Sequence, residues 1–309
     1  MLICKTCPHV STVTKPYRDF ADFLAEHFNC KMQKITINAG FSCPNRDGTK
    51  GRGGCTYCNN QSFNPDYCTP TKSVSQQIEE GIRFFSRKYP SMRYLAYFQA
   101  YTNTHAELSR LKAIYEEALS HPLVDGLIIG TRPDCMPDTL LDYIEELNKR
   151  HFVLIEYGAE TSHNSTLQLV NRCHSWEDTV YAVRRTTTRH IPVGLHLILG
   201  LPNETIEMML ATIRKVSSLP IDILKLHQLQ IIRGTRLAAD YEANKYDINN
   251  FTADEYIDLC CEIIKILPPT IAIERFVSQS PDSLLISPRW GLKNYQFTNL
   301  LHQRLKNRK

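Results

Sequence analysis

Three cysteines close together in the sequence, Cys43, Cys55 and Cys58, are the residues best suited to chemistry. They belong to a stretch, 43–58, whose four glycines and one proline disfavour both helix and strand. We expect a loop that brings the three thiols to one point, where thiolates bind a soft metal centre. Four thiolates complete a zinc site or a cluster, whereas three leave one iron of a [4Fe–4S] cluster open for another ligand. The count of three therefore indicates a reactive cluster.

A structural zinc site is the alternative. Cys68 lies ten residues after Cys58 and would supply a fourth ligand. A zinc ribbon usually has two close Cys-x-x-Cys pairs, however, and this region has only the pair formed by Cys55 and Cys58. The loop alone thus favours a cluster and leaves zinc open. A further pair near the N-terminus, Cys4 and Cys7, is interpreted as two thiols of a tail, with a metal knuckle as the alternative.

The composition is that of a globular chain of one large domain with extensions: 309 residues, 42% hydrophobic and 22% charged. No apolar run reaches the ~18–20 residues of a membrane span, and the first residues lack the apolar segment of a signal peptide. Eleven cysteines without an export signal predict reduced thiols in the cytoplasm. A net charge of +4 permits an RNA substrate but does not require one, because nucleic-acid modules are usually more basic.

The elements that position the cysteines alternate between helix and strand. Apolar residues at helical spacing predict a helix within 17–28, and a β-branched alternating stretch predicts a strand at 34–39. Five more strands are expected after it, with helical segments between them, at 94–99, 126–130, 153–157, 193–199 and 223–229. Helices between strands predict a parallel α/β sheet, here a (β/α)6 partial TIM barrel. Its expected parts are an N-terminal helical extension (1–33), the barrel (34–231) and a small C-terminal extension (232–309) that closes the barrel and starts with a linker at 232–250.

Polar or glycine-containing segments follow every predicted strand. The cysteine stretch follows the first strand, and the others follow at 99–104, 131–134, 158–160, 200–204 and 228–230. In a β/α barrel the reactive residues lie at the C-terminal ends of the strands. The sequence therefore predicts an active site at that end of the barrel.

These motifs resemble the radical S-adenosylmethionine (SAM) superfamily. The resemblance rests on residues 39–49, 53–58, 97–104, 130–135 and 196–202, and residues 287–292 fit the family's C-terminal segment. The closest resemblance is to the YhcC-type family, which is related to the radical domain of the Elongator catalytic subunit. Within that family, the suspected subgroup is the MnmL-like branch, which modifies tRNA wobble uridines. The gap of eleven residues between Cys43 and Cys55 is longer than in most radical SAM enzymes but agrees with this family.

The resemblance implies that Cys43, Cys55 and Cys58 hold a [4Fe–4S] cluster whose open iron binds S-adenosyl-L-methionine. The residues then expected to bind this cofactor are Tyr57, Gln99, Tyr101, Thr102, Thr131, Arg132, Glu160, Arg172, His196, Gln228 and Leu229. Two of them depart from the family, since Glu160 stands where relatives often carry Gln and His196 where a relative has Asp. The implied activity is reductive cleavage of SAM to a 5′-deoxyadenosyl radical, with Cys68 and Cys135 as candidate hydrogen donors and core packing as their alternative role.

Kinship further suggests a tRNA substrate, for example conversion of a carboxymethylaminomethyl group on a wobble uridine to an aminomethyl group. Arg46, Lys50 and Arg52 of the cysteine loop are expected to contact its phosphates. Flavodoxin or ferredoxin is the expected electron donor, and no membrane partner is expected. The alternatives are a radical SAM enzyme acting on a small molecule or peptide, and a non-catalytic iron–sulfur or zinc-binding scaffold.

Overall fold

The computed structural model describes residues 15–60, 64–86 and 91–308, so Cys4 and Cys7 lie outside the described residues. The strands are β1 (Met32–Ile37), β2 (Arg93–Phe98), β3 (Val124–Thr131), β4 (Phe152–Glu160), β5 (Val193–Leu199), β6 (Ile223–Gln228), β7 (Ile231–Ile232), β8 (Ala272–Arg275) and β9 (Leu285–Ser287). The helices are α1 (Phe20–His27), α2 (Val74–Ser86), α3 (Leu108–Leu119), α4 (Asp138–Asn148), α5 (Asn164–Leu169), α6 (Trp176–Thr187), α7 (Ile206–Ser217), α8 (Arg236–Glu242), α9 (Ala253–Ile266) and α10 (Asn294–Asn307).

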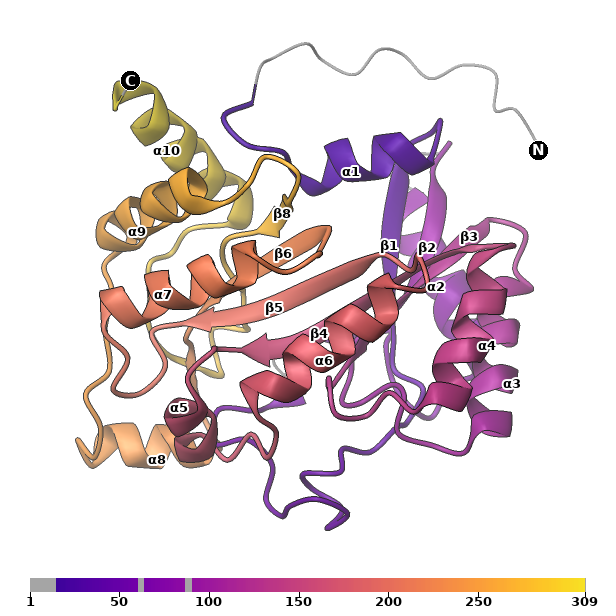
Figure 1. Ribbon diagram of the computed structural model, residues 1–309, viewed down its shortest axis with the longest axis horizontal. Coiled ribbons are helices and arrows are strands. Elements are labelled where there is room, and N and C mark those ends of the chain that lie inside the picture. The colour runs from indigo at the N-terminus through magenta and orange to yellow at the C-terminus, as the bar shows by residue number, and fades with distance from the viewer. Residues whose placement is uncertain (1–14, 61–63, 87–90, 309) are drawn as a thin grey trace.

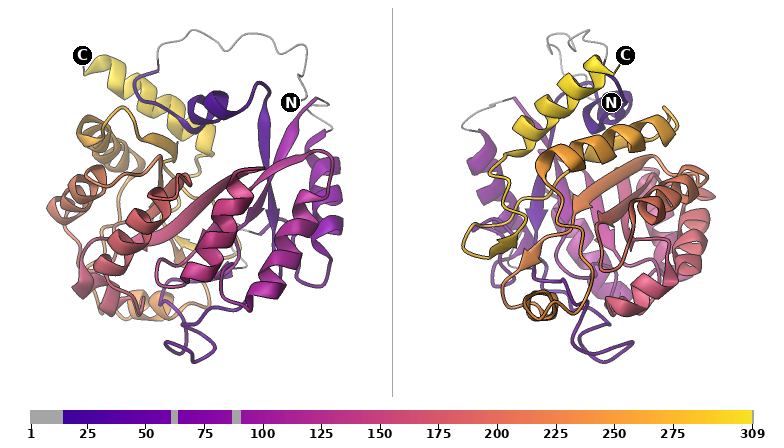
Figure 2. Two further views of the ribbon diagram at one scale, coloured as in Figure 1. Left: turned by 45° about the vertical axis from the view of Figure 1, so that its right-hand side comes forward. Right: turned by 90° about the vertical axis from the view of Figure 1, so that its left-hand side faces the viewer.

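Seven parallel strands form one sheet in the order β1-β2-β3-β4-β5-β6-β8. The sheet curls into a half-barrel with helices α2, α3, α4, α6 and α7 on its outer face (Figures 1 and 2). The predicted partial barrel and its six strands are confirmed. A seventh strand, β8, comes from the segment that was expected only to close the barrel.

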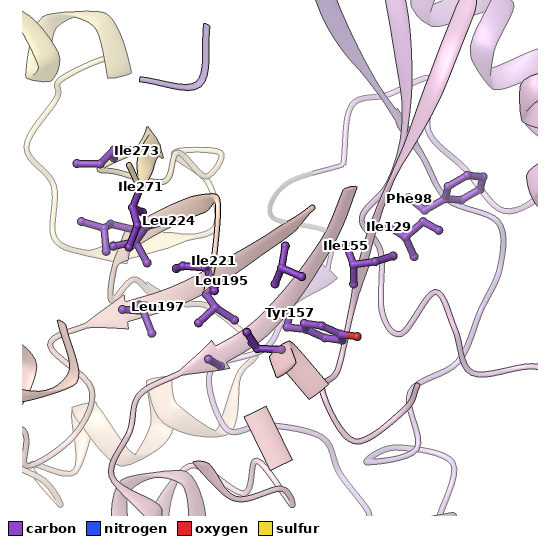
Figure 3. Close-up of a cluster of buried hydrophobic side chains, with 14 of the residues drawn as sticks. Phe98, Ile129, Ile155, Tyr157, Leu195, Leu197, Ile221, Leu224, Ile271 and Ile273 are labelled. Atoms are coloured by element: carbon purple, nitrogen blue, oxygen red, sulfur yellow. The ribbon is translucent and has the colours of Figure 1, made fainter. Parts of the chain in front are cut away.

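Alternate residues of each strand face opposite sides of the sheet, as the strand geometry requires. In β4, Ile155 and Tyr157 belong to the large apolar cluster between sheet and helices, which Figure 3 shows. Leu154 instead belongs to a small cluster that contains Phe23 and Leu24 of α1. Helix α1 therefore closes one end of the barrel interior. The loops that follow the strands lie at the other end (Figure 1). Residues of these loops line the cavity described below.

The C-terminal segment is more ordered than the sequence suggested. The expectation of a linker at 232–250 is wrong, because α8 forms there and begins where the side chain of Thr235 accepts a hydrogen bond from the amide of Ala238 at 3.1 Å. Strands β7 and β9 pair antiparallel, and α9 packs against α10. Within the described ranges, no helix is both long and apolar enough to cross a membrane.

Candidate active site

The cysteine loop joins β1 to α2, and its own backbone folds it back on itself. The amide of Arg46 donates to the carbonyl of Cys43 at 2.7 Å, and the amide of Gly54 donates to that of Asn45 at 2.8 Å. Gly54 has a φ of +77°, and a Cβ there would lie 2.8 Å from Nε of Arg46. That arginine is fixed, since its Nη2 donates to the carbonyl of Cys58 at 2.9 Å. A glycine is therefore required where the loop turns toward the last two cysteines.

Cys43, Cys55 and Cys58 all line one cavity of about 240 Å³ at the C-terminal end of the barrel. Polar N–H groups face the most buried sulfur, because Asn45 Nδ2 and Arg172 Nη1 each lie 3.6 Å from Sγ of Cys55. Burial, and then the neighbouring Cys55, raises the pKa of Cys58 to about 11. Thiols in such a setting ionise readily only when a cation shares their charge, and a coordinating thiol is deprotonated outright. The donor set therefore fits a metal centre.

The arrangement suits a cluster better than zinc. In residues 15–60, 64–86 and 91–308, no three His, Cys, Asp or Glu side chains are placed to hold a single metal ion. A cluster offers a separate iron to each thiolate, so it accommodates thiols spread along a cavity wall. Cys68, the fourth ligand of the zinc alternative, is buried and does not line the cavity.

The two candidate hydrogen donors, Cys68 and Cys135, both lie outside the cavity lining. Burial raises the pKa of each thiol to about 12. Cys135 lies with its sulfur 3.6 Å from Oδ1 of Asp134. Their packing agrees with the core role that was the alternative, and a role as hydrogen donor stays a prediction.

The cavity gathers every residue predicted to contact the cofactor, namely Tyr57, Gln99, Tyr101, Thr102, Thr131, Arg132, Glu160, Arg172, His196, Gln228 and Leu229. Two of their hydroxyl groups, Tyr57 Oη and Thr102 Oγ1, are buried without a hydrogen-bond partner in the described part of the chain. Such groups are costly unless a ligand completes them. Tyr101 and Glu160 have φ values of 62° and 65°, a strained conformation that concentrates at functional sites. These features fit a bound polar cofactor, and the individual contacts stay predictions.

Arg172 connects the strand ends to the cysteine loop. Its Nη2 donates to the carbonyl of Gly158 at 2.7 Å and lies 3.1 Å from Oε1 of Glu160. Burial works against its charge, but Tyr57, Glu160 and Cys55 hold the pKa of Arg172 well above its usual value. The site therefore keeps a permanent positive charge beside the thiols, where a carboxylate ligand would be favoured.

The side chains of two other residues predicted to contact the cofactor, Arg132 and Gln228, already bind other groups of the protein. The buried Arg132 forms an ion pair with Asp134, with Nε 2.9 Å from Oδ1. The amide of Gln228 holds the backbone of Ser278 at both ends, since its Oε1 accepts from the Ser278 amide at 2.7 Å and its Nε2 donates to the Ser278 carbonyl at 2.9 Å. These side chains shape the wall, so we expect a contact from Gln228 to a ligand to come from its backbone.

A deeper layer of ionisable residues, of which only His196 was expected from the sequence, forms the floor of the cavity. Glu156 and His196 line the cavity, and Lys34, Lys225 and Glu274 pack beneath them. Lys225 Nζ lies 3.1 Å from Glu156 and 2.8 Å from Glu274, while Lys34 Nζ lies 2.9 Å and 2.6 Å from the same two residues. His196 Nε2 lies 2.7 Å from Glu156. Burial disfavours the charge of Glu156, but the two lysines hold its pKa well below its usual value. The sequence did hold a signal for these residues, since Glu156 and Lys225 are charges that interrupt the apolar runs of β4 and β6.

Comparison with known proteins agrees with this site. Residues 43–216 match the radical SAM superfamily and residues 221–307 match the radical SAM C-terminal domain. The chain is 35% identical to YtqA, an uncharacterised protein of Bacillus subtilis, over 96% of this chain and 92% of that protein. It is 37% identical to protein YhcC of Escherichia coli, with coverages of 88% and 86%. A region covering 60% of this chain is 24% identical to the tRNA uridine(34) acetyltransferase of Methanocaldococcus infernus, of which it covers 34%.

Two solved structures share the fold. Elp3 of Methanocaldococcus infernus, lacking its N-terminus, has a TM-score of 0.66 at 16% identity and covers 90% of this chain and 63% of its own. Methylornithine synthase has a TM-score of 0.56 at 13% identity, with coverages of 92% and 84%. Enzymes of the radical SAM superfamily bind a [4Fe–4S] cluster and S-adenosylmethionine, and the three thiols with their polar surroundings fit that pair. The chain thus belongs to the radical SAM superfamily and is a radical SAM enzyme of the YhcC and YtqA type.

Proposed function

We propose that this enzyme modifies a side chain of the wobble uridine in tRNA. One support is similarity to a protein named as a tRNA uridine(34) acetyltransferase, whose name specifies the wobble nucleotide. The observation that carries the proposal is a polar groove beside the cavity. The groove and the cavity share the wall that contains Cys55, Cys58 and Tyr101, and the groove is lined further out by Arg52 and Arg236. A positively charged path leading to the thiols suits a polyanionic chain.

The basic residues of the cysteine loop differ in their availability for RNA. Arg46 is held by the carbonyl of Cys58, and Lys50 forms an ion pair with Asp134 at 2.7 Å. Arg52 is exposed and has no ion pair among the described residues. Arg236 lies 3.9 Å from Asp240, but its side chain is 69% exposed. We therefore assign the phosphate contacts to Arg52 and Arg236, in place of the full set of Arg46, Lys50 and Arg52.

The chain's own residues would position both reactants. Cys43, Cys55 and Cys58 would hold the cluster, and reduction of SAM bound to it would supply a 5′-deoxyadenosyl radical for removing a hydrogen atom from a substrate carbon. Arg172, Tyr57 and Thr102 would orient the cofactor, and the walls of the cavity would limit the access of water. Tyr101 is 39% exposed where cavity and groove meet, so its ring offers a face on which a base can stack. Swinging a poorly stacked anticodon base into the cavity costs about a few kcal/mol or less.

Within this proposal, a carboxymethylaminomethyl group would be oxidised by two electrons at its carboxymethyl carbon at the expense of one SAM. Hydrolysis of the resulting imine would release glyoxylate and leave an aminomethyl group. The electron comes from flavodoxin or ferredoxin, and the enzyme works in the cytoplasm. Kinship with wobble-uridine enzymes supports the reaction. An iron–sulfur cluster needs one electron at low potential, which supports the donor. The buried thiols of Cys68, Cys135, Cys260 and Cys261 form no disulfide, which supports a reducing compartment.

The direct test compares modified nucleosides in tRNA from cells with and without this protein. The proposal predicts that a wobble nucleoside with the longer side chain accumulates when the protein is absent. An unchanged nucleoside profile would instead favour a small molecule or peptide as the substrate.

A further inference from the structure

The floor of the cavity has an unusual composition for a barrel interior. Such interiors are normally filled by layers of branched apolar side chains. Here the inward positions near the middle of β4, β5 and β6 carry Glu156, His196, Lys225 and His227, and the first two and His227 line the cavity. This layer lies below the strand ends that carry the predicted cofactor contacts. The polar side chains of this layer therefore face any ligand that occupies the cavity beneath the cysteine loop.

An irregularity in the last strand adds a further charge to this floor. The register between β6 and β8 pairs Leu224 with Ile273 and Lys225 with Arg275, so β8 holds one extra residue at this point. A bulge of this kind re-aims side chains. Consecutive residues consequently both reach the interior, since Glu274 contacts Lys225 at 2.8 Å and Arg275 lines the cavity.

The charges of the floor do not balance. Its two carboxylates, Glu156 and Glu274, are each shared by Lys34 and Lys225. Arg275 has no carboxylate partner among the described residues, and its Nε is buried there without any hydrogen-bond partner. A partly buried guanidinium that lacks a counter-charge is unfavourable, because part of its charge is removed from water without compensation. The cavity therefore presents an unpaired cation to its contents.

The neighbours of Arg275 do not supply the missing negative charge. Its Nη2 lies 3.1 Å from Nδ1 and 3.2 Å from Nε2 of His227, so the guanidinium sits against the imidazole ring. Burial, and then the charge of Arg275, hold the pKa of His227 well below its usual value, which keeps the ring neutral. The hydroxyl of Ser278 lies 2.5 Å from Nδ1 of His227 and fixes the ring. Arg275 is thus an unpaired cation surrounded by the neutral polar groups of His227 and Ser278.

We propose that Arg275 binds an anionic group of the substrate, through carboxylate or phosphate oxygens, at the floor of the cavity. The planar guanidinium fork matches either group. Arg172 lies 3.6 Å from the sulfur of Cys55 and therefore suits the cofactor, whereas Arg275 lies on the β8 side and is left for the substrate. The inference rests on the proposed function only for the identity of the substrate, where the anion is a carboxylate on the uridine side chain or a phosphate of the same nucleotide.

The test measures binding to the cluster-containing enzyme with SAM and without reductant, by anaerobic calorimetry. The probes are 5-carboxymethylaminomethyluridine, its methyl ester and inorganic phosphate. For a carboxylate, the parent should bind the acid roughly tenfold or more tightly than the ester, and Arg275→Gln should abolish that preference. For a phosphate, the parent should bind inorganic phosphate and Arg275→Gln should lose it. Arg275→Lys should retain part of the binding, because it keeps the charge and loses the fork.

Arg233→Gln is the matched control, since this exposed arginine follows β7 and lies outside the cavity lining. It should bind the probes like the parent. The inference is overturned if neither anion binds more tightly to the parent than to Arg275→Gln while both proteins hold equal cluster and melt alike. An Arg275-dependent anion site with no change in cellular tRNA nucleosides would leave the inference standing and overturn the proposed function alone.

Discussion

Arg172 and Cys55, 117 residues apart in the sequence, meet in the cavity with Nη1 3.6 Å from Sγ. The same guanidinium holds the carbonyl of Gly158 and the carboxylate of Glu160. One side chain therefore ties the cysteine loop to the end of β4. The position of the thiols and the shape of the cofactor wall depend on each other through this contact.

Replacing Arg172 by Met should reduce the free energy of unfolding by about 3 kcal/mol or more, because it leaves the buried Glu160 without its partner. It should also impair reconstitution of the cluster through the lost contact with Cys55. Urea unfolding and iron content measure the two effects. Arg184→Met on the exposed side of α6 is the control and should change neither. Equal stabilities of the two variants would contradict the coupling role of Arg172.

Changing Cys43, Cys55 or Cys58 to Ala should remove the iron–sulfur cluster from anaerobically reconstituted protein, because each thiol would hold its own iron. Cys68→Ala and Cys135→Ala should retain it, since both residues lie outside the cavity lining. Iron and sulfide analysis with the visible absorption spectrum gives the readout. Stoichiometric zinc that depends on Cys68 would contradict the cluster assignment.

Gly54→Ala should reduce cluster occupancy more than Gly53→Ala. Both glycines have positive φ, 77° and 80°, so alanine costs about 1–2 kcal/mol of backbone strain at either position. Only at Gly54 would the new Cβ also meet Arg46, at 2.8 Å from Nε, whereas nothing lies within 4 Å at Gly53. Comparing the two variants therefore separates the effect of the contact with Arg46 from the effect of backbone strain. Equal iron content and equal melting temperatures would show that the Arg46 contact is unimportant.

His174 predicts a specific pH dependence of stability. Burial, and then the charge of Arg172, lower the pKa of His174 to about 3. Below the usual value of about 6.5 the unfolded chain binds a proton that the folded protein refuses, so this residue makes stability fall between pH 6.5 and 3.

His174→Gln should shrink the loss of unfolding free energy between pH 7 and pH 5 by about 2 kcal/mol in cluster-free protein. His174→Asn, which also removes the imidazole, should shrink this loss to the same extent. Urea titrations at the two pH values decide the matter. An unaltered difference in His174→Gln would show that this histidine is protonated in the folded state as readily as in the unfolded chain.

Replacing Arg52 and Arg236 by Gln should weaken tRNA binding and flatten its salt dependence. Two lost phosphate contacts to a single-stranded loop reduce the log–log slope by up to about 1.4. Arg214→Gln with Lys215→Gln removes the same charge from the exposed side of α7 and should leave the slope near that of the parent. Binding titrations over a range of salt concentrations provide the comparison. If both double variants behave alike, the groove is not the RNA contact.

The features that depend on a local sequence pattern could be predicted from the sequence. The spacing of Cys55 and Cys58 is visible within four residues, and each of β1 to β6 has its own apolar or alternating run followed by a polar segment. The cavity consequently contains every residue that strand-end reasoning and family resemblance had selected. That agreement concerns position, and the chemical role of each residue is a separate question.

The floor of the cavity depends on pairings that no local pattern reveals. Arg275 lies beside Lys225, 50 residues earlier, only because β8 joins the sheet next to β6 with a shifted register. A four-residue strand in a segment rich in turns gives no sign of its partner, so it was assigned to a closing extension. Glu156 and Lys225 were hidden by their apolar neighbours, which identify a strand but not which charge faces the interior.

Modification of tRNA by this enzyme can be measured with purified protein that holds its cluster, given SAM, a strong reductant and tRNA from cells that lack the protein. 5′-Deoxyadenosine and methionine should form in amounts that match the loss of the longer wobble side chain. Cys55→Ala should form neither product and should leave the side chain unchanged. Cleavage of SAM by the parent without any change in the tRNA would contradict the proposed substrate. An intact, reduced cluster that leaves SAM uncleaved even with tRNA present would contradict the assignment of this cavity as the reaction site.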